Sequence, residues 1–125
     1  MKIINDDDIK KIISNEFNED YWYSELGKSN SIENNEKTDN ELIYSFYEQG
    51  IYLWHKHQSK LKNILCENDK KEPKENIKEL IEGNIKELIV NIISILVTGY
   101  ALPLAISIPL CSLAIKKGIY KLCKD

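Results

Sequence analysis

Residues 88–115 read LIVNIISILVTGYALPLAISIPLCSLAI and contain no charged side chain, whereas Lys, Glu, Asp and Asn crowd the residues before them. A helix that is apolar on all sides leaves water, either for the inside of a protein assembly or for a lipid bilayer. The place where this segment is buried therefore constrains the fold and the function more than any other feature.

The part of the chain before this segment predicts two amphipathic helices. The first runs over residues 5–17, with Asn5 or Asp6 as its N-cap and apolar side chains at helical spacing. The second starts at residue 38 or 39 and runs to about residue 66 with one broad apolar stripe. Gly50 lies in that stripe, and we expect it to let another helix approach closely.

Two stretches between and after these helices are harder to assign. Residues 21–26 begin with Tyr-Trp-Tyr, which fits either a short strand or an aromatic anchor on the next helix. Residues 27–40 are almost wholly polar and predict a loop. Residues 67–75 are a charged break that ends the second helix, because Pro73 cannot continue it.

The C-terminal part, residues 74–125, predicts an apolar pair of helices. One helix runs from about residue 74 to 98 and contains the sequence NIKELI twice, and the other runs from about residue 103 to 122. The fold class is therefore all-α, a small bundle of about four helices. Residues 1–125 are expected to form a single domain, in which residues 1–66 supply the acidic amphipathic part.

Charge and cysteine content exclude several classes of function. Residues 1–87 carry 13 lysines and 19 acids, and the chain has no arginine. Nucleic acid is therefore not favoured as a partner, because binding to phosphate needs a dense basic face. Cys66, Cys111 and Cys123 are odd in number and widely spaced, which predicts free thiols in a reducing cytoplasm.

The residues show no pattern for catalysis. His55 and His57 are the only histidines, and two positions apart on a helix they diverge and cannot share a metal ion. His57 projects into the apolar stripe, which is typical of a core histidine, while His55 points away. No nucleophile elbow and no glycine-rich phosphate loop is present. We expect no enzyme activity, no catalytic residue, no cofactor and no metal.

Three environments can bury the apolar segment. A single membrane span is disfavoured by Gly99, Pro103 and Pro109 in its middle, and because it would carry the C-terminal lysines across the membrane. A membrane hairpin with both ends in the cytoplasm avoids that problem. Burial among helices avoids it too, but a chain of this length buries only about two thirds of its unfolded surface, which predicts a homo-oligomer or a protein partner.

The sequence therefore favours a non-enzymatic interaction protein of the cytoplasm, an accessory, inhibitor or immunity-type subunit. The alternative is a hairpin that inserts into the inner face of a membrane as a bacterial effector or small toxin. In either function the contact residues would come from the apolar helices. They are Ile85, Leu88, Ile89, Ile92, Ile93, Ile95, Leu96, Leu102, Leu104, Ile106, Ile108 and Leu110.

Overall fold

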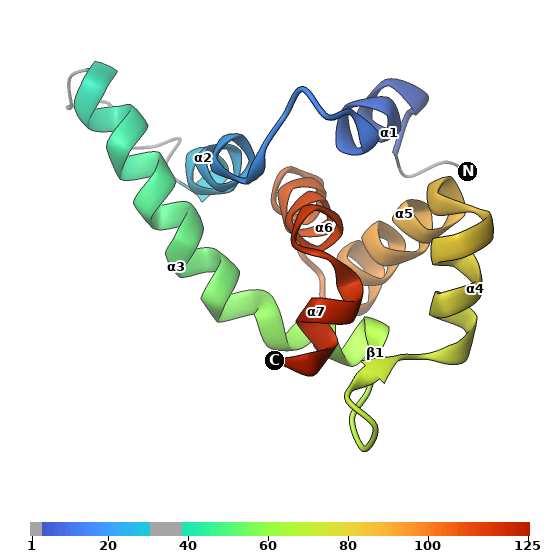
Figure 1. Cartoon of the computed structure of the whole chain (residues 1–125). Coiled ribbons are helices and arrows are strands. Elements are labelled where there is room, and N and C mark those ends of the chain that lie inside the picture. The colour runs from blue at the N-terminus through green and yellow to red at the C-terminus, as the bar shows by residue number, and fades with distance from the viewer. Residues whose placement is uncertain (1–3, 31–38) are drawn as a thin grey trace.

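The computed structural model describes residues 4–30 and 39–125, without the side chains of residues 30 and 39–45. This part of the chain is mostly helical, as predicted (Figure 1). It contains seven α-helices, one π-helical turn and a sheet of two very short strands, where the sequence predicted about four helices. The additional helices arise from one stretch that was not recognised as helical and from two interruptions described below.

The N-terminal part forms two helices, α1 (Asp6–Ile13) and α2 (Glu19–Asn30). Asn5 caps α1, since its side-chain oxygen accepts a hydrogen bond from the backbone N–H of Asp8 at 2.8 Å. Asn18 plays the same part for α2 and accepts from the N–H of Tyr21 at 2.9 Å. The aromatic stretch at residues 21–26 is therefore helical, and the option of a strand there is wrong.

The helical residues of α2 also correct the predicted loop at residues 27–40. The helix continues through residues 27–30, and the next helix, α3 (Asp39–Leu65), includes residues 39 and 40. The remainder of the predicted loop lies outside the described residues. The prediction of a long helix from residue 38 or 39 to about 66 is confirmed by α3.

Helices α2 and α3 pack against each other through two glycines. A Cβ atom added at Gly50 would lie 1.7 Å from the carbonyl oxygen of Tyr23, and one added at Gly27 would lie 1.8 Å from that of Phe46. Both positions therefore exclude any side chain, because the obstacle is backbone that cannot rotate away. The expectation that Gly50 admits a neighbouring helix is confirmed.

We predict that Gly50→Ala lowers the free energy of unfolding by about 1–3 kcal/mol, because the methyl group must push α2 away from α3. Gly83→Ala is the matched control, since an added Cβ there meets nothing within 4 Å. The control should leave stability unchanged or raise it by about 0.5 kcal/mol. Urea unfolding of both variants measures the difference, and equal stability of the two would contradict the close packing.

The charged break after α3 contains a small hairpin of two strands, β1 (Cys66–Glu67) and β2 (Glu72–Pro73). Cys66 in β1 forms a disulfide with Cys123 in the last helix, α7 (Ile119–Lys124), and only Cys111 is a free thiol. The prediction of three free thiols is wrong. The two cysteines lie 57 residues apart in the sequence, and only the packing of α7 against the hairpin brings them together.

We predict that the Cys66→Ser/Cys123→Ser variant loses about 4 kcal/mol of stability, because the bond closes a long loop in the unfolded chain. Urea unfolding with and without a thiol reductant measures this loss. Reductant should shift the wild-type midpoint to that of the double variant and leave the double variant unchanged. A wild-type midpoint that does not respond to reductant would show that the two thiols are not bonded.

The predicted helix over residues 74–98 is divided into three pieces, α4 (Glu75–Gly83), α5 (Ile85–Ser94) and a π-helical turn, η1 (Ile95–Gly99). The break between α4 and α5 falls at Asn84, where the second NIKELI copy begins. Asn84 leaves the helical conformation and caps α5, as its side-chain oxygen accepts from the N–H of Glu87 at 3.1 Å. The two copies therefore lie on separate helices.

The last predicted helix, residues 103–122, is also interrupted. α6 (Leu104–Lys117) ends at Gly118, whose φ of 96° lies in the left-handed region that glycine adopts readily, and α7 follows. Pro103 precedes α6, whereas Pro109 lies inside it.

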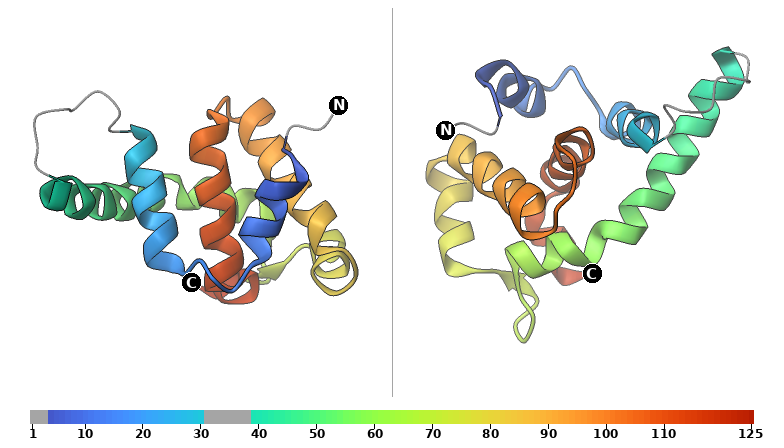
Figure 2. Two further views of the ribbon diagram at one scale, coloured as in Figure 1. Left: turned by 90° about the horizontal axis from the view of Figure 1, so that it is seen from above. Right: turned by 180° about the vertical axis from the view of Figure 1, so that it is seen from behind.

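α6 occupies the centre of the fold. Figures 1 and 2 show α6 between α1 and α2, with α3 and α5 beyond it, and all four of these helices contact it. Its residues Leu110, Cys111, Leu113 and Ala114 are completely buried. The buried hydroxyls of Ser107 and Ser112 donate to the backbone carbonyls of Pro103 and Ile108 at 3.0 and 2.7 Å. Such bonds let a polar side chain enter an apolar core at little cost.

Candidate interaction surface

The charge-free segment folds into a helical hairpin of α5, η1 and α6, and the rest of the chain covers half of the predicted contact residues. Six of those twelve side chains have no exposed surface in the single chain. They are Leu88, Ile89, Ile92, Ile93, Leu96 and Leu110. In this conformation they belong to the hydrophobic core and hold the fold together.

The other predicted contact residues retain exposed surface. Ile95 is 42% exposed and Leu104 is 36% exposed. Ile85, Leu102, Ile106 and Ile108 are half-buried. Whether these side chains contact a partner stays a prediction, but most of them gather at the turn of the hairpin, which we call the hairpin tip (residues 95–106).

The hairpin tip is an ordered turn without a charged residue. The N–H of Leu102 donates to the carbonyl of Leu96 at 3.0 Å, and the Thr98 hydroxyl donates to the carbonyl of Ser94 at 2.6 Å. Ala101 has a φ of 55°, a left-handed conformation that costs an L-residue roughly 1 kcal/mol. The tip therefore holds its apolar side chains at the surface in a defined arrangement.

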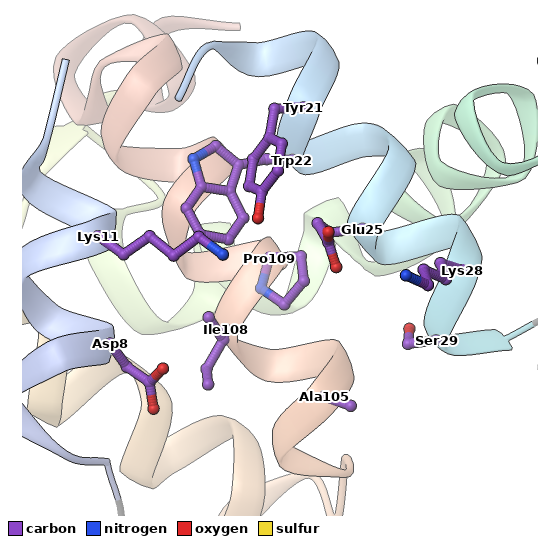
Figure 3. A pocket seen from close by; sticks show the side chains of 10 residues that line it. All are labelled: Asp8, Lys11, Tyr21, Trp22, Glu25, Lys28, Ser29, Ala105, Ile108 and Pro109. Atoms are coloured by element: carbon purple, nitrogen blue, oxygen red, sulfur yellow. The ribbon is translucent and has the colours of Figure 1, made fainter. Parts of the chain in front are cut away.

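A groove lies beside the tip, between α1 and α2, with α6 as its floor (Figure 3). We call it the α1–α2 groove; its cavity has a volume of about 320 Å³. Ala105 links its floor to the hairpin tip. The lining residues are Asp8 and Lys11 from α1, Tyr21, Trp22, Glu25, Lys28 and Ser29 from α2, and Ala105, Ile108 and Pro109 from α6.

Lys11 is held against aromatic side chains beside this groove. Its ammonium lies 4.9 Å from the ring centroids of Phe17 and Tyr21 and 5.9 Å from that of Trp22. A hydrogen bond with the Tyr21 hydroxyl raises the pKa of Lys11, and the charges of Glu25 and Asp8 add to this effect. Lys11 therefore ties α1 to α2.

The two carboxylates of the groove have no such tie. Asp8 and Glu25 are half-buried, and within 4.0 Å neither forms an ion pair with a lysine of the described residues. Trp22 Nε1 is likewise buried without a hydrogen-bond partner in the described part of the chain. The groove could not be recognised in the sequence, because the i, i+3 pairs Asp8/Lys11 and Glu25/Lys28 become related only when α1 and α2 lie side by side.

The lysines at the end of α6 are used within the fold. Lys116 donates to the carbonyl of Ser14 at 2.5 Å. Lys117 pairs with Glu19 at 2.9 Å and lies over the rings of Tyr23 and Trp54, at 5.0 and 5.5 Å from their centroids. These contacts fix the end of α6 to the N-terminal helices.

The side chains with potential chemistry do not converge. His57 is buried and its Nδ1 lies 3.0 Å from Lys60 Nζ, which confirms its interpretation as a core histidine, whereas His55 is exposed. Burial raises the pKa of the Cys111 thiol, so it stays protonated and unreactive. In the parts of the chain that the structure describes, no three His, Cys, Asp or Glu side chains could hold a metal ion together.

We predict that acidification destabilises the protein through His57. Its burial, together with the charges of Lys60 and Lys56, lowers its pKa below 6.5, the usual value, which applies to the unfolded chain. The unfolded state therefore takes up the proton first, so this contribution to stability is complete above pH 6.5 and is lost as the pH falls through the pKa of the folded state.

Urea unfolding at neutral and mildly acidic pH measures this effect. The His57→Gln variant should lose less stability on acidification than the wild type, whereas the control His55→Gln should follow the wild type. An identical pH dependence for the wild type and His57→Gln would show that His57 does not titrate differently in the folded state.

Comparison with known proteins gives no match to this chain among family models, curated proteins or solved structures. Within residues 4–30 and 39–125, no helix has both the length and the apolar character that a membrane crossing requires.

Proposed function

We propose that this chain is a non-enzymatic interaction protein, an accessory, inhibitor or immunity-type subunit, and that it contacts a protein partner through the hairpin tip. The observation that carries this proposal is that Ile95 and Leu104 are both exposed within one uncharged turn, which joins two helices with buried core faces. Single exposed apolar side chains are common, whereas several of them in one uncharged turn favour an interaction site.

The construction of the tip supports the same proposal. The buried halves of α5 and α6 anchor the hairpin in the core, so the tip is presented on a rigid support. A preorganised apolar turn loses little conformational entropy when it binds.

The proposal is tested by the native mass of the tagged full chain, purified without detergent from the cells that produce it naturally. The wild type should have a mass above that of the 14.5 kDa monomer, because it carries a partner or a second copy. The Ile95→Glu/Leu104→Glu variant should be monomeric, because it places two charges in the apolar contact. Tyr52→Glu is the control, since Tyr52 is 66% exposed on α3, outside the tip, and this variant should keep the complex.

Two outcomes would overturn the proposal. The first is a wild type that is a monomer in every preparation. The second is a wild type found in the membrane pellet after a high-salt wash. That result would support the alternative function, a hairpin that enters a bilayer with the same uncharged tip.

A further inference from the structure

The α1–α2 groove is a hollow with an apolar floor between two helices of the bundle. α1 and α2 lie on either side of α6, as the left view of Figure 2 shows, and α6 supplies the floor through Ala105, Ile108 and Pro109. Trp22 extends this apolar floor on the side of α2. A surface of this kind, with helical walls, accepts the apolar face of an amphipathic helix.

Charged side chains border the apolar floor on both walls. α1 contributes Asp8 and Lys11, and α2 contributes Glu25 and Lys28, each pair three residues apart and so on one face of its helix (Figure 3). In helical assemblies, charges that flank an apolar seam in this way select the partner helix and its orientation.

Asp8, Glu25 and Lys28 are the charges of this border for which the described residues supply no ion pair. Lys11 is engaged by Tyr21 and by the three aromatic rings, whereas Asp8 and Glu25 form no ion pair with a described lysine. The surrounding chain carries a net negative charge, since residues 4–30 hold seven acids and three lysines. The complementary partner is therefore cationic along its flanks.

We infer that the α1–α2 groove binds an amphipathic helix with basic flanks, which belongs to a protein partner. Apolar side chains of that helix pack on Ala105 and Ile108, and its lysines or arginines approach Asp8 and Glu25. This inference rests on the proposed function, because it gives the chemistry of a partner for an interaction protein. It uses a surface next to the hairpin tip, however, and can be tested separately.

The test measures the binding of labelled synthetic peptides to the full-length protein by fluorescence anisotropy. The first probe is a peptide of leucine and lysine, about four turns long, with leucine at helical spacing. The second replaces every lysine with glutamate, and the third has the composition of the first in a scrambled order. The leucine–lysine helix should bind, more tightly at low salt than at high salt, and the other two should bind at least tenfold more weakly.

Two sets of variants locate the binding. Asp8→Asn/Glu25→Gln should weaken binding of the leucine–lysine peptide about tenfold, because two ion pairs are lost. The matched control Asp20→Asn/Glu48→Gln removes the same charge from exposed positions outside the groove and should bind as the wild type does. Ile108→Lys places a cation in the half-buried floor and should abolish binding, while circular dichroism verifies that each variant is folded.

Several results would overturn this inference: no binding to the wild type, equal binding of the glutamate peptide, or equal affinity of the groove variant and its matched control. A dimer that Ile108→Lys separates would also overturn it, because a second copy would then be the occupant. The Ile95→Glu/Leu104→Glu variant should bind the peptide normally. If the peptide assay fails while the native complex still depends on the tip, only the groove assignment is lost and the proposed function stands.

Discussion

The burial of α6 is the constraint on which the arrangement of the other helices depends. A helix without charge on any face, from Leu104 to Ile115, needs apolar neighbours in every direction. α5 reaches it through the turn of the hairpin, α2 and α3 approach it as a pair, and α1 covers a further part of it. The protein therefore uses its most apolar segment as the centre of the fold, and its charged helices are the outer layer.

Much of this fold could be predicted from the sequence, and the exceptions have physical reasons. α1 and α3 were recognised because each has an apolar stripe of helical period, and Gly50 was recognised as a point of close approach. α2 was missed because Tyr-Trp-Tyr suits a strand by propensity alone. The overlooked signal is Asn18. Its side-chain oxygen accepts a hydrogen bond from the N–H of Tyr21 and so caps the start of α2.

The candidate surfaces were less accessible to such reasoning. Apolar content identified the hairpin, but it could not separate Leu88 and Leu110, which the chain buries itself, from Leu104, which it leaves exposed. That difference depends on how far the neighbouring helices extend along α5 and α6. The Cys66–Cys123 bond and the groove depend in the same way on segments distant in sequence, for which local periodicity holds no information.

The contact between Gly27 and Gly50 has a consequence for the opposite face of α2. Gly27 lies about half a turn around the helix from Trp22 and Glu25, so the glycine face looks toward α3 while the other face looks into the groove. Because α2 is one helix, a side chain at Gly27 that moved it away from α3 would also shift Glu25. A substitution on the α3 side of α2 would thus alter the α1–α2 groove, although that side of the helix does not line it.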